Sequence, residues 1–595
     1  MKGKQYSWWA IIFIFAFILS ASFYFDLWSK NRMTIDAPSY YAYLPAFIIH
    51  HDLQLRFVDE DPSYYKDKIW FNKTDDNKRV IKHPMGVSVL LSPFFIAADW
   101  IASITGKPRT GYSIWYQNAV GIGVLFYLLA GLIFLRKILV EYYSEKVAAL
   151  TLISVVLGTN LLWYSTFEAL MSHSLSFSLW CICLYYFFKW IKSEASKFII
   201  AFSIAFGILV LIRPLSMVSI FYFFIFGILS RGGVRRGICF LRSKEAAVIA
   251  GALIFISITS LQLFYWKYAT GKWFYDAYQS ERFLFNQPEI FSFLFGFRKG
   301  VFIYTPILIF AVIGLIKMYR SNRELFYSIL AFTSVMIFIL SSWWAWSYGI
   351  CWGMRPMIDY YGLLSLPMGA AYSIILNRGQ LVRTVFYSVV TGMIALNLFQ
   401  TWQYKNGLIH FDDMSREAYF RGFFQTKASE EWIDLLKPYD WDRRMKGLPQ
   451  IEYSKKYFGH IGKNEEVHLR GSNLKYVFVN KEAGNAMAAL SNTGIGNEEK
   501  FYIEHLTDET VCIRSENGLL WSLHPEYRDA ILATGAINGP PEKFSVTYVV
   551  NEDNRIALKA SNGKYVSIGS QWPFILQAEA DSIGKEEVLR YYVIE

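Results

Sequence analysis

Asp36 is the residue of this sequence that most needs a chemical explanation. It stands just beyond the first long apolar run, in the segment TIDAPSYYAYLP at residues 34–45. Placing a carboxylate at a membrane boundary costs free energy, so we expect Asp36 to have a specific role. One role is that of a general base, which takes the proton from a hydroxyl group while that hydroxyl attacks a substrate. The alternative is structural, because an aspartate just before Pro38 could cap a short helix.

A second group of residues has the charge needed to bind a phosphate. Guanidinium and ammonium groups that are fixed before a reaction stabilise the charge developing on a phosphate leaving group. The candidates near the ends of later apolar runs are Arg213, Arg298, Lys299 and Arg355. Arginines in such places also extend toward lipid headgroups, and this alternative stays open for Arg213 and Arg355.

Glu168, in the segment STFEALMSHSLSF, is the candidate for a second catalytic carboxylate. A single carboxylate base opposite a phosphate leaving group predicts direct displacement with inversion, whereas retention requires a second, nucleophilic carboxylate nearby. We favour inversion, with Glu168 orienting an acceptor or pairing with His173. The candidates for positioning a sugar are Tyr40, His83, His173 and Trp346. His173 could equally be a core residue between helices, and Trp346 part of an interfacial aromatic belt.

No metal or other cofactor is predicted. The acidic run Asp59-Glu60-Asp61 lacks anything that fixes its geometry, and a solvated loop explains it better than a metal site. The five cysteines indicate neither a disulfide framework nor a zinc site.

The composition places these candidates in a membrane protein. Hydrophobic residues make up 54% of the 595 and aromatic residues 18%. Apolar runs long enough to cross about 30 Å of hydrocarbon recur from Trp8 to Phe399. About eleven can be counted, at 8–25, 115–135, 147–165, 169–188, 198–212, 215–230, 246–265, 301–316, 325–342, 357–376 and 384–400.

The basic residues predict the orientation of these runs. They gather at alternate boundaries, near 2–4, 136–146, 189–197, 231–244, 317–323 and 378–383. By the positive-inside rule these loops are cytoplasmic, so Asp36 and everything after Phe399 face outward. The net charge of +11 therefore reflects topology and headgroup contact, and no nucleic-acid partner is predicted.

Two segments need separate interpretation. Residues 84–98 are apolar but contain Pro84, Gly86 and Pro93, which favours an interfacial helix over a span. If this segment did cross the membrane, the carboxy-terminal domain would be predicted on the cytoplasmic side. The amino-terminal run is long for a signal peptide, so we expect an uncleaved anchor.

An internal repeat follows the last apolar run. The segments HLRGSNLKYVFV, CIRSENGLLWSL and ALKASNGKYVSI place Asn473, Asn517 and Asn562 about 45 residues apart. Alternating apolar residues and Asn-Gly pairs predict β-hairpins. Three copies suggest threefold closure, and the repeats resemble β-trefoil modules, particularly the fascin-like group. Trp521, Tyr565 and Trp572 could stack on sugars or belong to the core, so glycan binding and a structural or protein-contact role both stay open.

The first outward loop resembles that of the GT-C superfamily of glycosyltransferases, which use lipid-linked sugars. Protein O-mannosyltransferases and lipid A aminoarabinose transferases are members. In that superfamily an acidic residue shortly after the first span, followed by aromatic residues, supplies the catalytic carboxylate. Asp36 and the tyrosines at 40, 41 and 43 match this pattern, and the HPMG segment at His83 matches a proline-containing loop. The resemblance extends loosely over residues 8–415.

The apolar runs and the two resemblances together predict a polytopic α-helical membrane domain at 1–400, a membrane-proximal connector at 401–452 and an all-β β-trefoil domain at 453–595. The GT-C resemblance implies transfer of a sugar from a polyprenyl-phosphate donor to a hydroxyl of an extracytoplasmic glycan, lipid or protein acceptor. The expected location is a bacterial-type inner membrane, with the carboxy-terminal domain on the periplasmic side. Two alternatives stay open: a transporter or flippase of lipid-linked glycans, and a non-catalytic glycan-binding scaffold.

Overall fold

The chain forms two compact units, residues 1–406 and 407–595, which are described separately. Of the expected connector, residues 430, 431, 433, 434, 438, 440–443 and 448–452 lie outside the described residues, as do Trp572 and the first residues of the expected β domain. The computed structural model describes residues 5–65, 68–279, 281–429, 432, 435–437, 439, 444–447, 465–473, 475–491, 497–506, 510–536, 538–548, 555–569, 574–584 and 586–593.

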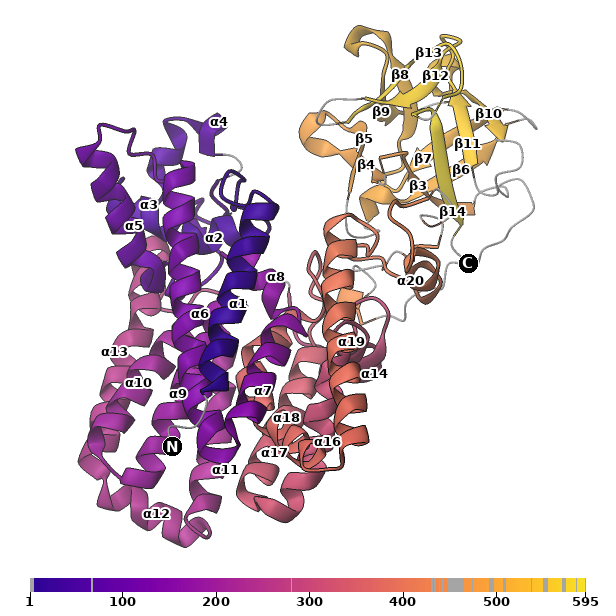
Figure 1. The fold of residues 1–595 in the computed structure, drawn as a ribbon. Helices are drawn as coiled ribbons and strands as arrows, with labels where there is room; N and C mark the ends of the chain where they lie inside the picture. The colour runs from indigo at the N-terminus through magenta and orange to yellow at the C-terminus, as the bar shows by residue number, and fades with distance from the viewer. Residues whose placement is uncertain are drawn as a thin grey trace. The chain divides into compact units, whose positions relative to one another are not determined.

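The first unit contains a set of long apolar helices that run side by side (Figure 1). Among the described residues, seven helices are long and apolar enough to cross a membrane, and eight if a pair bent by 103° forms one span. The protein is therefore a multi-pass membrane protein. The seven are α1 (Tyr6–Tyr24), α5 (Gly86–Ile104), α6 (Ile114–Tyr142), α9 (Ser172–Ser193), α13 (Glu245–Thr270), α17 (Arg323–Ser341) and α19 (Gln380–Lys405).

The other predicted runs form shorter or interrupted helices, so the count of eleven spans stays a prediction. Pro214 and Pro306 each open a 3-10 turn and Pro356 is the second residue of a third, because proline cannot donate the backbone hydrogen bond that continues a helix. The bent pair joins η2 and α11 to α12. The remaining segments are α7 (Glu145–Leu157), α8 (Leu161–Thr166), α10 (Ser196–Ile212), η2 (Pro214–Ser219), α11 (Ile220–Ser230), α12 (Val234–Ser243), α15 (Val301–Tyr304), η3 (Pro306–Leu308), α16 (Ile309–Ser321), η4 (Arg355–Tyr360) and α18 (Tyr361–Leu376).

Helix α5 is the segment for which an interfacial position was expected. By length and composition it is also a candidate span. It packs on α6, where the Tyr127 hydroxyl donates to the Leu90 carbonyl and the Tyr116 hydroxyl donates to Asp99. Its first residue, Gly86, lies against the backbone of Ile212 at the end of α10, where a Cβ atom would come within 2.3 Å. The helix thus starts beside the end of a neighbouring helix, and its interfacial position stays a prediction.

Short elements connect the long helices around one end of the unit. Small residues allow close helix packing there and along the bundle: Gly131 of α6 lies against Ser178 of α9. The short elements are α2 (Ala37–Tyr41), α3 (Tyr43–Ile48), η1 (Arg56–Asp59), α4 (Pro62–Tyr65), β1 (Phe71–Lys73), β2 (Arg79–Ile81) and α14 (Ile290–Phe295).

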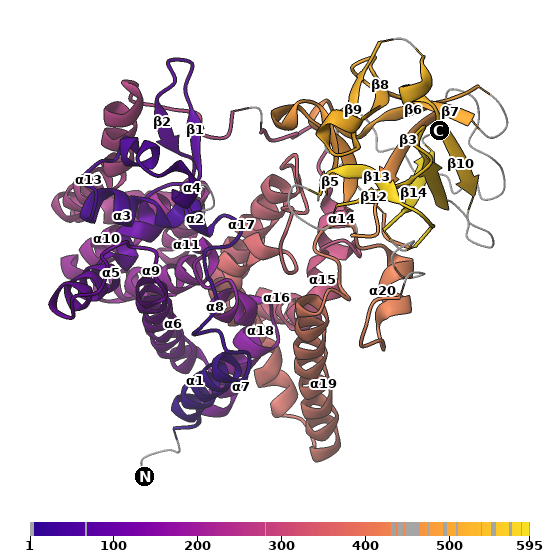
Figure 2. The same cartoon turned by 90° about the horizontal axis from the view of Figure 1, so that it is seen from above.

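The second unit contains α20 (Arg416–Gly422) and twelve antiparallel strands (Figure 2). Six of the strands pair in a closed ring in the order β3-β6-β7-β10-β11-β14 and back to β3. They are β3 (Glu465–Arg470), β6 (Phe501–His505), β7 (Thr510–Ser515), β10 (Phe544–Tyr548), β11 (Arg555–Lys559) and β14 (Val588–Val593). This all-β domain is therefore a closed barrel.

Three hairpins complete the repeat, and their outer strands pair with one another. They are β4 (Tyr476–Asn480) with β5 (Ala486–Ser491), β8 (Leu520–His524) with β9 (Ala530–Gly535), and β12 (Tyr565–Ile568) with β13 (Leu576–Ala580).

The repeated asparagines lie in the turns that lead into these hairpins, as predicted. The side-chain oxygens of Asn473, Asn517 and Asn562 each accept a bond from the backbone amide two residues later. Asx turns of this kind suit asparagine. Trp521 is fully buried in the barrel core, so its position excludes the sugar-stacking alternative for that residue, while Tyr565 is half-buried.

Candidate functional site

A cavity of about 460 Å³ lies in the first unit, where the ends of several helices and their connecting loops meet. The distribution of basic residues in the sequence predicts that these helix ends face outward. The described lining combines charged, aromatic and apolar side chains: Asp36, Tyr40, Lys82, His83, Pro84, His173, Ile212, Arg213, Pro214, Leu215, Asp276, Tyr278, Glu281, Phe283, Trp343, Tyr348 and Arg355.

Asp36 occupies the position before α2, yet its carboxylate makes no capping hydrogen bond. Only the backbone carbonyl of Asp36 caps the helix, because it accepts hydrogen bonds from the amides of Ser39 and Tyr40. The carboxylate instead pairs with the Arg355 guanidinium, at 3.1 Å between Oδ2 and Nη1. The capping alternative therefore does not describe what this side chain contacts.

The electrostatic surroundings keep Asp36 ionised. Burial by itself raises the pKa of this carboxyl, but the positive charge of Arg355, aided by Lys82, outweighs burial and holds the pKa below its ordinary value. A carboxylate in this state is an acceptor only, and it can take a proton from a hydroxyl group.

A second ion pair lies beside the first. Arg213 follows α10 and its Nε contacts Asp359 Oδ2 at 3.0 Å, while His173 Nδ1 lies 3.0 Å from Asp359 Oδ1. Arg213 also donates to the Ser172 hydroxyl at 3.3 Å. Asp359 and His173 thus hold the guanidinium from one side, and Arg213 still reaches the cavity.

Tyr40 and His83 form an aromatic wall of the cavity, with ring centroids 4.4 Å apart. The Ser172 hydroxyl donates to the Tyr40 oxygen at 3.4 Å. Burial lowers the pKa of His83 to about 4, so this imidazole is neutral at pH 7. Its Nδ1 is buried without a hydrogen-bond partner among the described residues, which leaves the atom available to a ligand.

The structure does not bring four of the predicted residues into the described lining of the cavity. Glu168 is buried nearby, and burial raises its pKa to about 7. Lys299 is buried and donates to the carbonyl of Cys351, so its ammonium ties two loops together. Arg298 and Trp346 are also buried without lining the cavity. We therefore restrict the candidate phosphate site to Arg213 and Arg355.

Several residues in or beside the cavity were not predicted as site residues from the sequence. Asp359 had a usable signal, since it is an ionisable residue inside an apolar run, where such residues are expected to be functional. Lys82 lies beside His83 and pairs with Glu281 at 2.6 Å. Tyr278 and Trp343 pack edge to face, with ring centroids 5.8 Å apart. Among the described residues, no group of three or more metal-ligating side chains is placed to hold a metal ion.

No protein-family model matches this sequence, and no curated protein matches it. Among solved structures, ArnT from Cupriavidus metallidurans is similar over 68% of this chain and 67% of its own, with 10% identity and a TM-score of 0.40. The Archaeoglobus fulgidus oligosaccharyltransferase is similar over 78% of this chain and 62% of its own, with 11% identity and a TM-score of 0.39.

ThreeFoil, a designed protein with threefold symmetry, is similar over 21% of this chain and 97% of its own, with 12% identity and a TM-score of 0.20. The function proposed next depends on the side chains of the cavity.

Proposed function

We propose that this protein transfers a sugar from a polyprenyl-phosphate donor to a hydroxyl group of an extracytoplasmic glycan, lipid or protein, with inversion at the anomeric carbon. The observation that supports this most strongly is the convergence of one carboxylate and two guanidinium groups on a single cavity. Asp36 and Arg355 are 319 residues apart in the sequence, and Arg213 comes from a third segment. These groups supply the base and the phosphate-binding charges that such a transfer needs.

Arg213 and Arg355 are the proposed phosphate-binding residues. Both are anchored by carboxylates, which fixes their positions before a substrate enters. A phosphate would compete with Asp36 for the Arg355 guanidinium. The donor would thereby weaken the Asp36–Arg355 pair and free the carboxylate to act on an acceptor.

Asp36 is the proposed general base. When an acceptor hydroxyl attacks the anomeric carbon, its proton passes to the Asp36 carboxylate, and the bond from that carbon to the carrier phosphate oxygen breaks. A positioned base of this kind contributes about a hundredfold to ten-thousandfold in rate. Asp359 is occupied by Arg213 and His173, so we assign it to positioning rather than to nucleophilic attack.

Tyr40, His83 and His173 are the proposed sugar-positioning residues. The free Nδ1 of His83 offers a hydrogen bond to a sugar hydroxyl, and the Tyr40 ring lies beside it. The apolar residues Ile212, Pro214 and Leu215 line the same cavity and suit the start of an isoprenoid chain.

The remaining parts of the proposal concern the domains and the location. The closed barrel with three hairpins supports a β-trefoil at 453–595, which would hold or select the acceptor. The membrane domain is proposed at 1–400 and the connector at 401–452. The basic loops support a bacterial-type inner membrane location with an extracytoplasmic barrel.

The proposal is tested with full-length purified protein, labelled polyprenyl-phosphate sugars and a panel of hydroxyl acceptors. We expect wild-type protein to transfer the label and release the carrier phosphate, and Asp36→Asn to lose this activity while still binding donor. The matched control is Asp75→Asn, because Asp75 is an exposed carboxylate in the first unit that does not line the cavity. Full activity of Asp36→Asn would refute the assignment of the base.

A further inference from the structure

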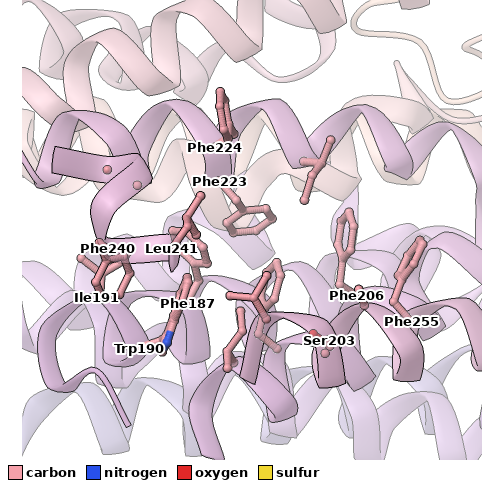
Figure 3. A pocket seen from close by; sticks show the side chains of 18 of the residues that line it. Phe187, Trp190, Ile191, Ser203, Phe206, Phe223, Phe224, Phe240, Leu241 and Phe255 are labelled. Atoms are coloured by element: carbon pink, nitrogen blue, oxygen red, sulfur yellow. The ribbon is translucent and has the colours of Figure 1, made fainter. Parts of the chain in front are cut away.

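Phenylalanine side chains are placed differently in the two units. Between helices of the first unit they gather around shared space: Figure 3 shows Phe187, Phe206 and Phe223, from three helices, lining one apolar cavity of about 350 Å³. On the short helix α20 of the second unit, Phe420 is 61% exposed and Phe424, just after the helix, is 88% exposed. Large apolar side chains that are exposed together on a part of the chain outside the spans mark an interaction surface.

Phe420 and Phe424 lie on one face of α20. They are four residues apart, and Phe423 between them keeps helical backbone angles (φ −59°, ψ −39°), so the two side chains project from the same side. The opposite face is buried: Ala418 is fully buried, and its carbonyl accepts a hydrogen bond from the Trp432 indole at 2.9 Å. The packing of that face fixes the direction in which the two phenylalanines point.

Helix α20 is tied to the point where the chain leaves α19. Gly422 lies beside Leu408, since a Cβ atom added at Gly422 would be 3.5 Å from the Leu408 carbonyl oxygen. Leu408 follows Lys405, the last residue of α19, by three residues, and three residues of chain reach at most about 11 Å. Trp402 and Tyr404 near that end are residue types that favour the membrane–water boundary. The exposed phenylalanines are therefore held within a short distance of this boundary.

Basic side chains flank the two phenylalanines. Arg416 and Arg421 are exposed on the same helix, and Lys427 is exposed shortly after it. The one acidic residue of the helix, Glu417, is paired with Lys437 at 3.6 Å. Phenylalanine rings beside arginine and lysine suit the headgroup boundary of a bilayer, where the rings enter the acyl region and the charges stay with the phosphates. Together with the short tether, this composition favours a lipid surface over a protein partner.

We propose that the face of α20 carrying Phe420 and Phe424 inserts into the membrane leaflet in which α19 ends, and that it anchors the start of the second unit to the lipid surface. The exposed basic residues beside the two rings contact the lipid phosphates. Trp432 of the same region is 1% exposed and is not part of this anchor. This inference does not depend on the proposed transfer reaction.

The test uses the full-length protein in lipid nanodiscs with a fluorescent label on a single cysteine. Cys239 is the exposed cysteine among the five, all of which the structure describes, so the label is attached at Lys427→Cys in a Cys239→Ser background. We expect phospholipids with a nitroxide near the headgroup to quench this label at least threefold more strongly than in the variant F420S/F424S. The control variant Tyr527→Ser removes an exposed aromatic side chain from the barrel and should keep the full quenching.

Equal lipid quenching with and without the two phenylalanines would overturn the proposal. A label that neither the lipid nitroxide nor an aqueous quencher reaches would show that this face contacts protein, and would also overturn it. Both side chains are exposed, so we expect the double variant to fold. The single variant Phe424→Ser changes the more exposed position and should reduce the quenching by an intermediate amount, so it gives a result even if the double variant does not fold.

Discussion

The two units of this protein differ in what their buried charged side chains surround. In the membrane unit, the side chain of Asp359 is 1% exposed and pairs with Arg213, Asp36 pairs with Arg355, and both arginines line one cavity. In the barrel unit, Arg470 is also 1% exposed, but it lies on a strand of the closed ring around a hydrophobic cluster that includes Trp521, and the ion pair of Arg514 with Glu504 stays about one-third exposed. Burying charges is expensive, so a fold retains them where they are needed for more than stability. The comparison points to the cavity as the place of chemistry and to the barrel core as the place of structure.

The largest effect expected from this contrast is that of Asp36→Asn. The amide keeps the shape of the side chain but cannot take a proton, so single-turnover sugar transfer should slow by about a hundredfold to ten-thousandfold. Donor affinity should be retained, because Arg213 and Arg355 remain. Rapid-quench measurements at saturating donor check this, and a rate within threefold of wild type would remove Asp36 from the reaction.

In the barrel unit, a substitution in the core should affect stability and leave donor binding unchanged. Trp521 is fully buried, and Trp521→Ala should destabilise the barrel by about 3–5 kcal/mol through lost contacts and a cavity. Hydrogen exchange of the full-length protein should show faster exchange throughout β8 and its neighbours, while donor binding at the membrane unit is unchanged. The milder variant Trp521→Phe should show exchange rates between those of the wild type and Trp521→Ala. Slow exchange in Trp521→Ala would contradict the assignment of Trp521 to a stabilising core.

A smaller effect is expected from the arginines. Arg355→Gln and Arg213→Gln each remove a charge-assisted hydrogen bond to the phosphate, so donor affinity should fall roughly tenfold to a hundredfold. Lys299→Gln, a cation that does not line the cavity, should not weaken donor binding specifically. If Lys299→Gln lowers donor affinity more than either arginine variant, the phosphate site is misplaced.

The smallest effect is a shift in pH dependence. Asp36 must be ionised to act as a base, so kcat/KM should fall only when the pH drops below its lowered pKa. Without Arg355, the main offset to burial is lost and the pKa rises, so the acid limb of Arg355→Gln should move to higher pH. Arg213 pairs with Asp359 instead of Asp36, so Arg213→Gln should move the limb less than Arg355→Gln does. An unmoved limb in Arg355→Gln would show that another group titrates.

The sequence predicted much of this arrangement because some signals are local. Asp36 could be found because a carboxylate next to an apolar run is rare, and the barrel repeat because asparagine recurs at matching turns. Loop orientation put Arg213, Arg298, Lys299 and Arg355 on one face, but it could not tell which of them point into a cavity.

The pairings themselves are long-range and could not be derived from sequence. Nothing local indicates that Arg355 meets Asp36 across 319 residues, or that Asp359 lies between Arg213 and His173. Trp521 remained ambiguous because an aromatic residue in a strand suits either a core or a surface. Helix breaks at Pro214, Pro306 and Pro356 were visible as prolines, yet apolar runs continued through them.

The most direct test of the central claim is a structure of the full-length protein with a polyprenyl-phosphate sugar bound. We predict that the phosphate contacts the guanidinium groups of both Arg213 and Arg355, that the Asp36–Arg355 pair is broken, and that the Asp36 carboxylate faces the anomeric carbon. A donor bound elsewhere, with the Asp36–Arg355 pair intact, would contradict the account.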